Sequence, residues 1–569
     1  MGKRSRNKRA ADSGVPATEP TTGISLRHPS HRLLLSVAFI SLLLAVIAFA
    51  VYWPSLKSDF VYDAHVEIFE ENYVTTFSNL PDVLSLKVIS MNVMLGSRPF
   101  QLLFMMFNTA LWGKEPFGFH LASNLLHATN VALLFIFLCR LIATELGSRS
   151  GPELLKARLA AAALTLLFAL HPVSVESVAE ISYSSSLLVM FFTLVALLLA
   201  TWFQLGRRMA LIIGGAAVLC TFLSIASKES GIATAFLLVV YWFLFRRQEA
   251  KAPWFFFLGA AIVVSIAFLG GRLKWGFVDP VHVNYLGGSF AGVFSIQPIL
   301  WVFMMGKLVW PVDLSADYHW EDMSVPALSV ALAILASVLL LQGWLAWRSR
   351  IGAMGVAVYW LSLAAVSNFM PLNHPIADRY YYLPLAGVAM QLLGAFLLIS
   401  RTRVAFWMAL APCVVALIPL TLLTLRREAV FASDEALWND TLRVSPHSPL
   451  SHSGVADTLA QKGNVDSAIA EYRKALELAP EDSHAGSQLG ILLSQKGQVD
   501  EALVLFEKAV RINPNISQFH NNLAITYFRL GRREDAVAQF EEAVRINPND
   551  TEARKNLAAV KASPATPPK

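Results

Sequence analysis

The sequence predicts an all-α protein in two parts, a polytopic membrane bundle of about eleven helical spans followed by an α-solenoid. The chain of 569 residues is 55% hydrophobic and only 15% charged, and its mean hydropathy is +0.51. Such a composition is too apolar for a soluble globular protein. Long apolar segments recur up to about residue 425, and a pattern with a period of 34 residues begins soon after them. These observations place a multi-span membrane domain at 33–425 and a repeat domain at 426–560.

Eleven apolar segments are each long enough to cross about 30 Å of hydrocarbon. They lie near residues 33–53, 118–142, 158–178, 184–205, 209–226, 231–246, 254–270, 325–347, 352–371, 383–400 and 404–425. If the basic tail 1–32 is cytoplasmic, the short arginine-rich loops fall on the cytoplasmic side as well. We therefore expect an integral protein of the cytoplasmic (inner) membrane, with the first loop 54–117 and the repeats on the extracytoplasmic, periplasmic side. Glycines and Pro298 interrupt the segment 286–310, which we expect to lie in the interface.

The formal net charge of +6 indicates membrane topology and no nucleic-acid partner. The excess is concentrated in short loops and in the N-terminal tail, at Lys3, Arg4, Arg6, Lys8 and Arg9. The three cysteines lie inside apolar segments without metal-ligand or redox spacing, so we interpret them as small core residues.

The C-terminal part contains an internal repeat. Prolines recur every 34 residues, at Pro446, Pro480, Pro514 and Pro548. Aromatic residues follow the same period, at Tyr472, Phe506 and Phe540. This is the pattern of the tetratricopeptide repeat, a pair of helices in which the aromatic side chain fills the groove and the proline ends the second helix. We expect full repeats at about 449–482, 483–516 and 517–550, a capping helix at 551–560 and a disordered tail at 561–569.

Stacked repeats of this kind form a curved solenoid whose concave face binds an extended protein segment in many proteins. The alternative is a spacer that binds no partner.

Ionisable and polar side chains near the ends of the predicted spans are the candidate site residues. A charged side chain inside the bilayer costs roughly 2.5–3.5 kcal/mol, so those that remain usually face a cavity or a partner. On the expected outer side they are Asp63, Arg98, His120, Asn124, His127, His171, Glu176, Lys228, Glu229, Asp378 and Arg379. Adjacent residues on a helix point about 100° apart. The pairs Lys228–Glu229 and Asp378–Arg379 are therefore expected to find partners in other segments, around a shared polar cavity.

The spacing of His120, Asn124 and His127 puts them on one face of a helix. They either support the site or form hydrogen bonds between helices.

The acidic stretch 60–72 follows the first span directly. Asp63 lies there at the expected membrane surface, where a lipid-linked substrate presents its headgroup. The other loop acids, Glu67, Glu70 and Glu71, are expected to be solvated.

Several short motifs occur in a fixed order before the repeats. They are Asp63, Arg98-Pro-Phe, the segment 119–127, His171-Pro-Val-Ser-Val-Glu176, Ser227-Lys-Glu-Ser-Gly231 and Ala377-Asp-Arg-Tyr-Tyr-Tyr-Leu-Pro384. In this order, and followed by the repeats, they resemble the transmembrane and tetratricopeptide repeat-containing glycosyltransferases, relatives of the protein O-mannosyltransferases. The resemblance covers nearly the whole chain. It implies the GT-C fold, a polyprenyl- or dolichyl-phosphate sugar donor, and transfer outside the cytoplasm to a hydroxyl of a protein or glycan acceptor.

The resemblance suggests an inverting transfer in which Asp63 accepts the proton of the attacking hydroxyl. Arg98, Lys228 and Arg379 are the candidates for binding the lipid phosphate. Glu176 and Asp378 would orient these cations or bind the sugar. His171, Glu229, His120, Asn124 and His127 would support the site. No cofactor is required by default, and a divalent metal ion is not excluded.

Two positions depart from the family pattern, and each could reduce activity. Ala64 stands where the family has a second acid, and Ser184 to Ser186 stand where it has an arginine-containing stretch. The main alternative function is a non-catalytic membrane scaffold that displays the repeats. A transporter is less well supported, because the charged residues gather at one interface and not at the midplane.

Overall fold

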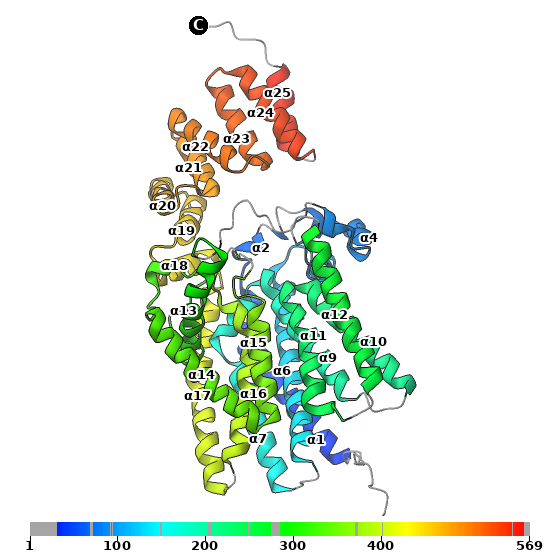
Figure 1. Ribbon diagram of the computed structural model, residues 1–569. Helices are drawn as coiled ribbons and strands as arrows, with labels where there is room; N and C mark the ends of the chain where they lie inside the picture. Colours follow the sequence, from blue (N-terminus) through cyan, green and yellow to red (C-terminus); the bar gives the residue numbers. More distant parts are fainter. Residues whose placement is uncertain are drawn as a thin grey trace, which may run out of the picture.

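The structure is a computed structural model that describes residues 31–65, 67–68, 72–91, 93, 95–147, 151–202, 207–248, 251–274, 285, 287–369, 372, 374–400, 402–548 and 550–562. Every regular element in these ranges is a helix. A bundle of long helices forms one part, and a stack of shorter helices rises from one end of it (Figure 1). The predicted fold class, a membrane helical bundle followed by a repeat solenoid, is confirmed. Of the predicted tails 1–32 and 561–569, residues 1–30 and 563–569 lie outside the described residues, and the others belong to the ends of α1 and α25 (Thr551–Ala562).

The bundle contains the predicted membrane spans. Within the described ranges, nine helices are long and apolar enough to cross a membrane. The eleven predicted spans coincide with eight of these nine, with the bent pair Pro152–Ala169 and Pro172–Ala179, and with the shorter apolar helices Ser36–Val51 and Arg350–Ala364. The helices are α1 (His31–Val51), α6 (Pro116–Leu146), α7 (Pro152–Ala169), α9 (Ser184–Thr201), α10 (Arg207–Ser227), α11 (Ala233–Tyr241), α12 (Lys251–Lys274), α14 (Leu328–Arg348), α15 (Arg350–Ala364), α16 (Tyr382–Ile399) and α17 (Arg403–Val430). The chain is a multi-pass membrane protein.

Successive spans alternate in direction, which gathers the polar loops at one end of the bundle, called the site end below. There Asn124 Nδ2 of α6 donates to the carbonyl of Tyr52, 2.7 Å away, and Thr424 Oγ1 of α17 donates to the carbonyl of Leu170. At the opposite end, Arg350 Nε of α15 lies 3.2 Å from Glu145 Oε2 of α6. The solenoid emerges at the site end (Figure 1).

The ninth long helix, α13 (Phe290–Val309), has the length and composition of a span but does not follow this alternation. Near its start, the side-chain amide of Gln297 lies 2.8 Å from that of Asn368. At its other end, the carbonyl of Leu308 accepts from His171 Nε2 at 3.1 Å. Both contacts are with site-end loops, so α13 lies at that end. The interfacial placement of 286–310 stays a prediction, because α13 also has the length and composition of a span.

The first loop folds over the site end as short helices. They are α2 (Asp63–His65), α3 (Asn72–Thr75), α4 (Leu80–Leu84) and α5 (Pro99–Trp112). Helix α5 packs into the bundle through Phe100, whose ring lies 5.0 Å from that of Phe192, and through Gln101 Nε2, which donates to the carbonyl of Ser182.

The solenoid consists of helix pairs at the predicted period. Its helices are α18 (Asp434–Val444), α19 (Pro449–Gln461), α20 (Val465–Leu478), α21 (Ser483–Gln495), α22 (Val499–Ile512), α23 (Ser517–Arg529), α24 (Arg533–Ile546) and α25 (Thr551–Ala562). Tyr472, Phe506 and Phe540 are buried between them. Each turn within a pair holds a glycine at a φ near +80° (Gly463, Gly497 and Gly531), a conformation that favours glycine because it has no Cβ.

The shared end of the first loop and the repeats can be tested by labelling. Single cysteines that replace Ser78 and Gln518, both exposed, should react with an impermeant thiol reagent in sealed vesicles of one orientation. A cysteine at the exposed Thr144, at the opposite end of α6, should react only in vesicles of the other orientation. If the cysteines at positions 78 and 518 reacted in vesicles of opposite orientation, the alternation described above would be wrong.

Candidate active site

Asp63 lies at the site end in a cluster of an acid, an aromatic ring and a cation. Tyr183 Oη donates to Asp63 Oδ2 at 2.9 Å. The guanidinium of Arg379 stacks on the Tyr183 ring, 4.0 Å from its centroid. Glu176 binds Arg379 twice, accepting from its backbone N–H at 2.7 Å and from its guanidinium. The partly exposed Asp63 is thus positioned by three residues from three loops.

The pair Arg379–Glu176 is almost fully withdrawn from solvent. The two side chains are 6% and 1% exposed. Breaking a buried ion pair by removing one partner costs about 3–5 kcal/mol, because the other charge stays buried and unpaired. Glu176 therefore holds Arg379 in place, as one of its two predicted roles requires.

A second cluster surrounds Glu229. Its carboxylate pairs with Arg98 at 3.0 Å and with Arg272 of α12 at 3.3 Å. Lys228 Nζ donates to Ser186 Oγ at 3.0 Å and lies 5.5 Å from the centroid of the Tyr380 ring. Burial, together with the nearby Arg98, lowers the pKa of Lys228 to about 7. Two arginines pair with one carboxylate here, which leaves the cluster with an excess of positive charge even when Lys228 is neutral.

Asp378 lies in a third, fully buried set of contacts. Tyr318 Oη donates to Asp378 Oδ1 at 2.7 Å, and Arg427 of α17 lies 3.5 Å from Asp378 Oδ2. Arg427 also pairs with Asp440 of α18 at 3.2 Å. The predicted partners in other segments are present for all four residues of the two adjacent charged pairs. For Asp378 these partners connect the bundle to the first solenoid helix.

Two acids near Asp63 were missed as site residues. Glu67 was expected to be solvated, which is wrong, because its side chain is buried and burial raises its pKa to about 8. Glu180 is fully buried, and burial raises its pKa well above the ordinary value, with further increases from Asp63 and Glu67. Local polarity suggested a solvated loop, whereas the loop around Glu67 packs into one apolar cluster with α5 and Ile181. Glu70 and Glu71 lie outside the described residues.

The polar residues of α6 and His171 act within the fold. His127 Nδ1 lies 2.7 Å from Tyr382 Oη, Asn124 donates to Tyr52 and Ser55, and His120 lies 3.4 Å from the carbonyl of Asp59. His171 accepts from the N–H of Val173 through Nδ1 and holds α13 through Nε2. For His120, Asn124 and His127 the sequence analysis left two alternatives, support of the site or hydrogen bonds between segments. The structure shows hydrogen bonds between segments.

Asp434, the first residue of α18, binds the first loop on both sides of Asp63. Its Oδ1 accepts from the backbone N–H of Tyr62 at 2.9 Å, and its Oδ2 lies 2.9 Å from His65 Nε2. Tyr62 has a φ of +55°, a strained conformation for a residue with a side chain. The ring of Trp438 packs against that of Tyr62 at 5.1 Å. Contacts from the first solenoid helix therefore stabilise the backbone conformation of the loop that carries Asp63.

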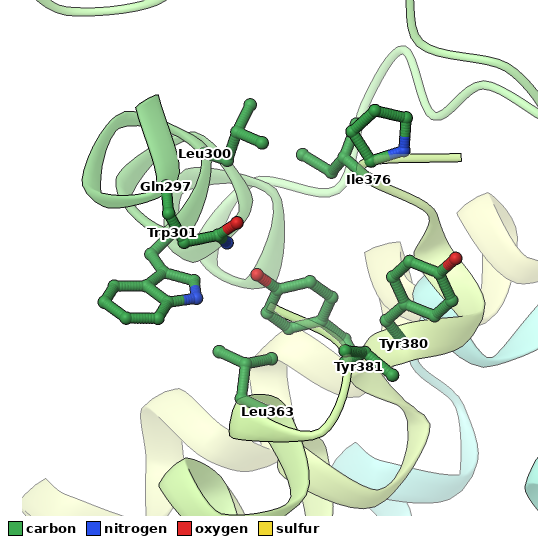
Figure 2. Close-up of a pocket in the computed structure, with 9 residues that line it drawn as sticks. Gln297, Leu300, Trp301, Leu363, Ile376, Tyr380 and Tyr381 are labelled. Atoms are coloured by element: carbon green, nitrogen blue, oxygen red, sulfur yellow. The ribbon is translucent and has the colours of Figure 1, made fainter. Parts of the chain in front are cut away.

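A small cavity lies where α13 covers the segment Asp378–Tyr381, lined in part by Gln297 and Trp301. In Figure 2 the side chain of Tyr381 is directed towards α13, and the side chain of Tyr380 lies on the side of Tyr381 away from α13. The cavity volume of about 10 Å³ leaves room for at most one water molecule. It is a packing defect under α13 and not a sugar site.

Among the described residues, no group of three or more histidine, cysteine or acidic side chains is arranged to hold a metal ion. The chemistry that these residues themselves offer is a positioned carboxylate at Asp63 and a cationic cluster around Glu229.

Comparison with known proteins agrees with the two-part architecture. Family models described as tetratricopeptide repeat match residues 434–483, 459–520 and 493–560. Relatives include the protein O-mannosyl-transferase F38B6.6 of Caenorhabditis elegans, 25% identical over 77% of this chain, and Tmtc3 of Drosophila melanogaster, 24% identical over 67%. A third is TMTC4 of Mus musculus, 25% identical over 77%. The matches cover 62%, 48% and 65% of these relatives, so the chain spans about half to two thirds of their length. They confirm the resemblance predicted from the sequence.

Similar solved structures include MamA from Desulfovibrio magneticus, 22% identical with a TM-score of 0.21, covering 22% of this chain and 73% of that protein. Another is a tetratricopeptide repeat protein of Thermus thermophilus, 18% identical with a TM-score of 0.20, covering 28% of this chain and 93% of that protein.

The pairing of Asp434 with His65 predicts that the contact between α18 and the first loop depends on pH. The hydrogen bond to Asp434 raises the pKa of His65. Protonated His65 therefore stabilises the contact with Asp434 below about pH 6.5. This stabilisation is lost as the pH rises through the raised pKa of His65. Asp434→Ala should lower the hydrogen-exchange protection factor of the Tyr62 amide by about tenfold and remove its pH dependence. The control is Glu435→Ala, which removes a neighbouring carboxylate that is 54% exposed. Equal protection in both variants would show that Asp434 does not hold the loop.

Proposed function

We propose that this chain is a membrane glycosyltransferase that moves a sugar from a polyprenyl-phosphate donor to a hydroxyl acceptor, a protein Ser or Thr or a glycan, on the extracytoplasmic side. The observation that carries the proposal is the placement of a partly exposed carboxylate, Asp63, at the same end of a membrane bundle as a cluster with excess positive charge. This pairing suits a reaction that removes a proton from an acceptor and releases an anionic lipid phosphate. The mannosyltransferase names of the relatives support the same reaction class.

In the proposed step, the acceptor oxygen attacks the anomeric carbon while Asp63 takes the hydroxyl proton. The bond between that carbon and the phosphate oxygen breaks, and its electron pair leaves with the polyprenyl phosphate. A well-placed general base contributes typically 10²–10⁴-fold to the rate. Tyr183 positions the carboxylate by its hydrogen bond, and Arg379 fixes the Tyr183 ring.

The leaving phosphate requires cations in a partly desolvated site. Arg98 is 28% exposed and Arg272 is 14% exposed, so both can reach a ligand that approaches from outside. Arg379, predicted as a phosphate ligand, is instead engaged by Glu176 and Tyr183 and would act by positioning. Lys228, with a lowered pKa, would add charge once an anion is bound.

The solenoid would recruit the protein acceptor or another protein partner. Its first helix already contributes Asp434 to the loop that holds Asp63. A non-catalytic scaffold would need neither the positioned carboxylate nor the surplus of cations, and the first experiment below distinguishes the two functions.

Asp63→Asn should preserve folding and donor binding and lower transfer by roughly 10² or more, because the amide cannot accept the proton. Arg98→Gln should by contrast weaken donor binding as well as turnover. Asp59→Asn, an exposed acid of the same loop, is the control and should stay active. The measurement is sugar transfer by purified protein from a polyprenyl-phosphate donor. Near-normal transfer by Asp63→Asn would refute Asp63 as the base and favour the scaffold.

The division of labour between the two parts can be tested by truncation. A chain that ends after residue 480 keeps the bundle contacts of Asp434 and of Ser448, whose Oγ donates to Asp317 at 2.6 Å. It should retain donor binding and transfer to a short threonine peptide, while transfer to folded envelope proteins falls at least severalfold. A parallel loss with both acceptors would mean that the outer repeats complete the membrane site and do not recruit acceptors.

A further inference from the structure

A series of hydrogen bonds leads from the base of the solenoid to the residue that precedes Asp63. Ser448 Oγ donates to Asp317 Oδ2 at 2.6 Å. Asp317 Oδ1 lies 3.4 Å from His374 Nδ1, and His374 Nε2 lies 3.0 Å from Tyr62 Oη. The four residues come from four separate segments of the chain. Folding therefore connects the first repeat to the side chain beside the candidate base.

The charge of Asp317 sets the direction of these hydrogen bonds. Burial opposes the ionisation of Asp317, but the hydrogen bonds from His374 and Ser448 outweigh burial and hold the pKa of this carboxyl below its ordinary value. An ionised carboxylate only accepts hydrogen bonds, so Nδ1 of His374 carries the ring proton. In the neutral imidazole Nε2 is then an acceptor. Tyr62 therefore donates its hydroxyl proton to His374.

This direction leaves the oxygen of Tyr62 as an acceptor towards other ligands. Burial and the nearby Asp63 raise the pKa of Tyr62 well above its ordinary value, so the phenol keeps its one proton, which is engaged by His374. The remaining lone pairs on Oη accept hydrogen bonds and the group has no second proton to donate. Because Tyr62 is partly exposed, a donor that approaches from outside can reach this oxygen.

Tyr62 is held close to Asp63 from two sides. Its ring packs edge-on against that of Tyr183, with centroids 6.4 Å apart, and the hydroxyl of Tyr183 binds Asp63. From the solenoid, Asp434 accepts from the backbone N–H of Tyr62, and Trp438 packs against its ring. An acceptor whose hydroxyl reaches Asp63 therefore lies beside Tyr62.

We propose that Tyr62 Oη accepts a hydrogen bond from a backbone N–H of a protein acceptor, next to the attacking hydroxyl. Asp317 and His374 are positioning residues that keep this oxygen an acceptor. The inference rests on the proposed function and adds how the acceptor is oriented at Asp63. A peptide fits better than a glycan, because an N–H can only donate, whereas a sugar hydroxyl donates or accepts and needs no fixed direction.

Two conservative variants alter this oxygen in different ways. Tyr62→Phe removes it. Asp317→Asn presents an amide N–H to His374 Nδ1, which moves the ring proton to Nε2, so that Tyr62 accepts from His374 and its own proton opposes the peptide N–H. Each variant should raise the KM for a peptide acceptor about tenfold, the effect of one lost hydrogen bond. The kcat should stay nearly unchanged, because Asp63 is intact and the lost contact is one of uniform binding.

The matched control is His447→Gln. It breaks another histidine–aspartate pair at the base of the solenoid, in which His447 Nδ1 lies 2.6 Å from Asp322 Oδ1. This pair does not contact Tyr62 in the series described above, so the KM for the peptide should stay as in the unaltered protein.

The experiment measures KM and kcat for sugar transfer from polyprenyl-phosphate mannose to a threonine peptide by the full chain in nanodiscs. In a set of peptides, an ester replaces one amide at a time around the threonine, which removes a single N–H. With the unaltered protein and with His447→Gln, one of these esters should raise KM about tenfold. With Tyr62→Phe and with Asp317→Asn the same ester should have no further effect, and the double variant should equal either single one.

A purely structural role would give a different pattern. If each ester changed KM equally in the unaltered protein and in Tyr62→Phe, or if none changed KM in the unaltered protein, the assignment of Tyr62 would be overturned while the proposed function stood. Transfer to an oligosaccharide and to no peptide would overturn it as well. The comparison with Tyr62→Phe decides without Asp317→Asn, should the latter fail to fold. Absence of transfer to every acceptor by the unaltered protein would overturn the proposed function itself.

Discussion

A guanidinium removed from water must be paired, and the site end depends on how Arg379 meets this requirement. Glu176 supplies the opposite charge from the loop after α7, while Tyr183 supplies an aromatic face from the loop before α9. Because desolvated cations stacked on aromatic rings gain about 2 kcal/mol, both contacts favour one geometry. The hydroxyl of the same tyrosine reaches Asp63. The position of the candidate base is therefore a consequence of how a buried cation was neutralised.

The membrane spans and the repeats could be predicted because each has a local signal. Apolar length indicates a span, and a 34-residue period indicates a helix pair. Pairing between segments has no such signal. That Arg98 and Arg272 would share Glu229, or that Arg427 would join Asp378 to Asp440, depends on which helix ends meet.

The candidate site shows the same division. Its acid, its cations and the need for distant partners could be inferred from residue types near span ends. Glu67 and Glu180 could not, because both lie in sequences that read as loop and only tertiary packing buries them. Ala64 is equally instructive: the small residue at the position of the family's second acid is fully buried, and the additional carboxyl groups near Asp63 come from Glu67 and Glu180.

The first solenoid helix belongs structurally to both parts. Asp434 and Asp440 of α18, His447 and Ser448 beyond it, all bind residues of the bundle. A solenoid fastened at several points cannot swing as a domain on a flexible linker would. It acts as a fixed arm, so a segment bound along its concave face would leave the arm at a constant distance and direction from Asp63. An acceptor hydroxyl would then be selected by the number of residues between it and the segment that the solenoid binds. The acceptor sequence around that hydroxyl would matter less.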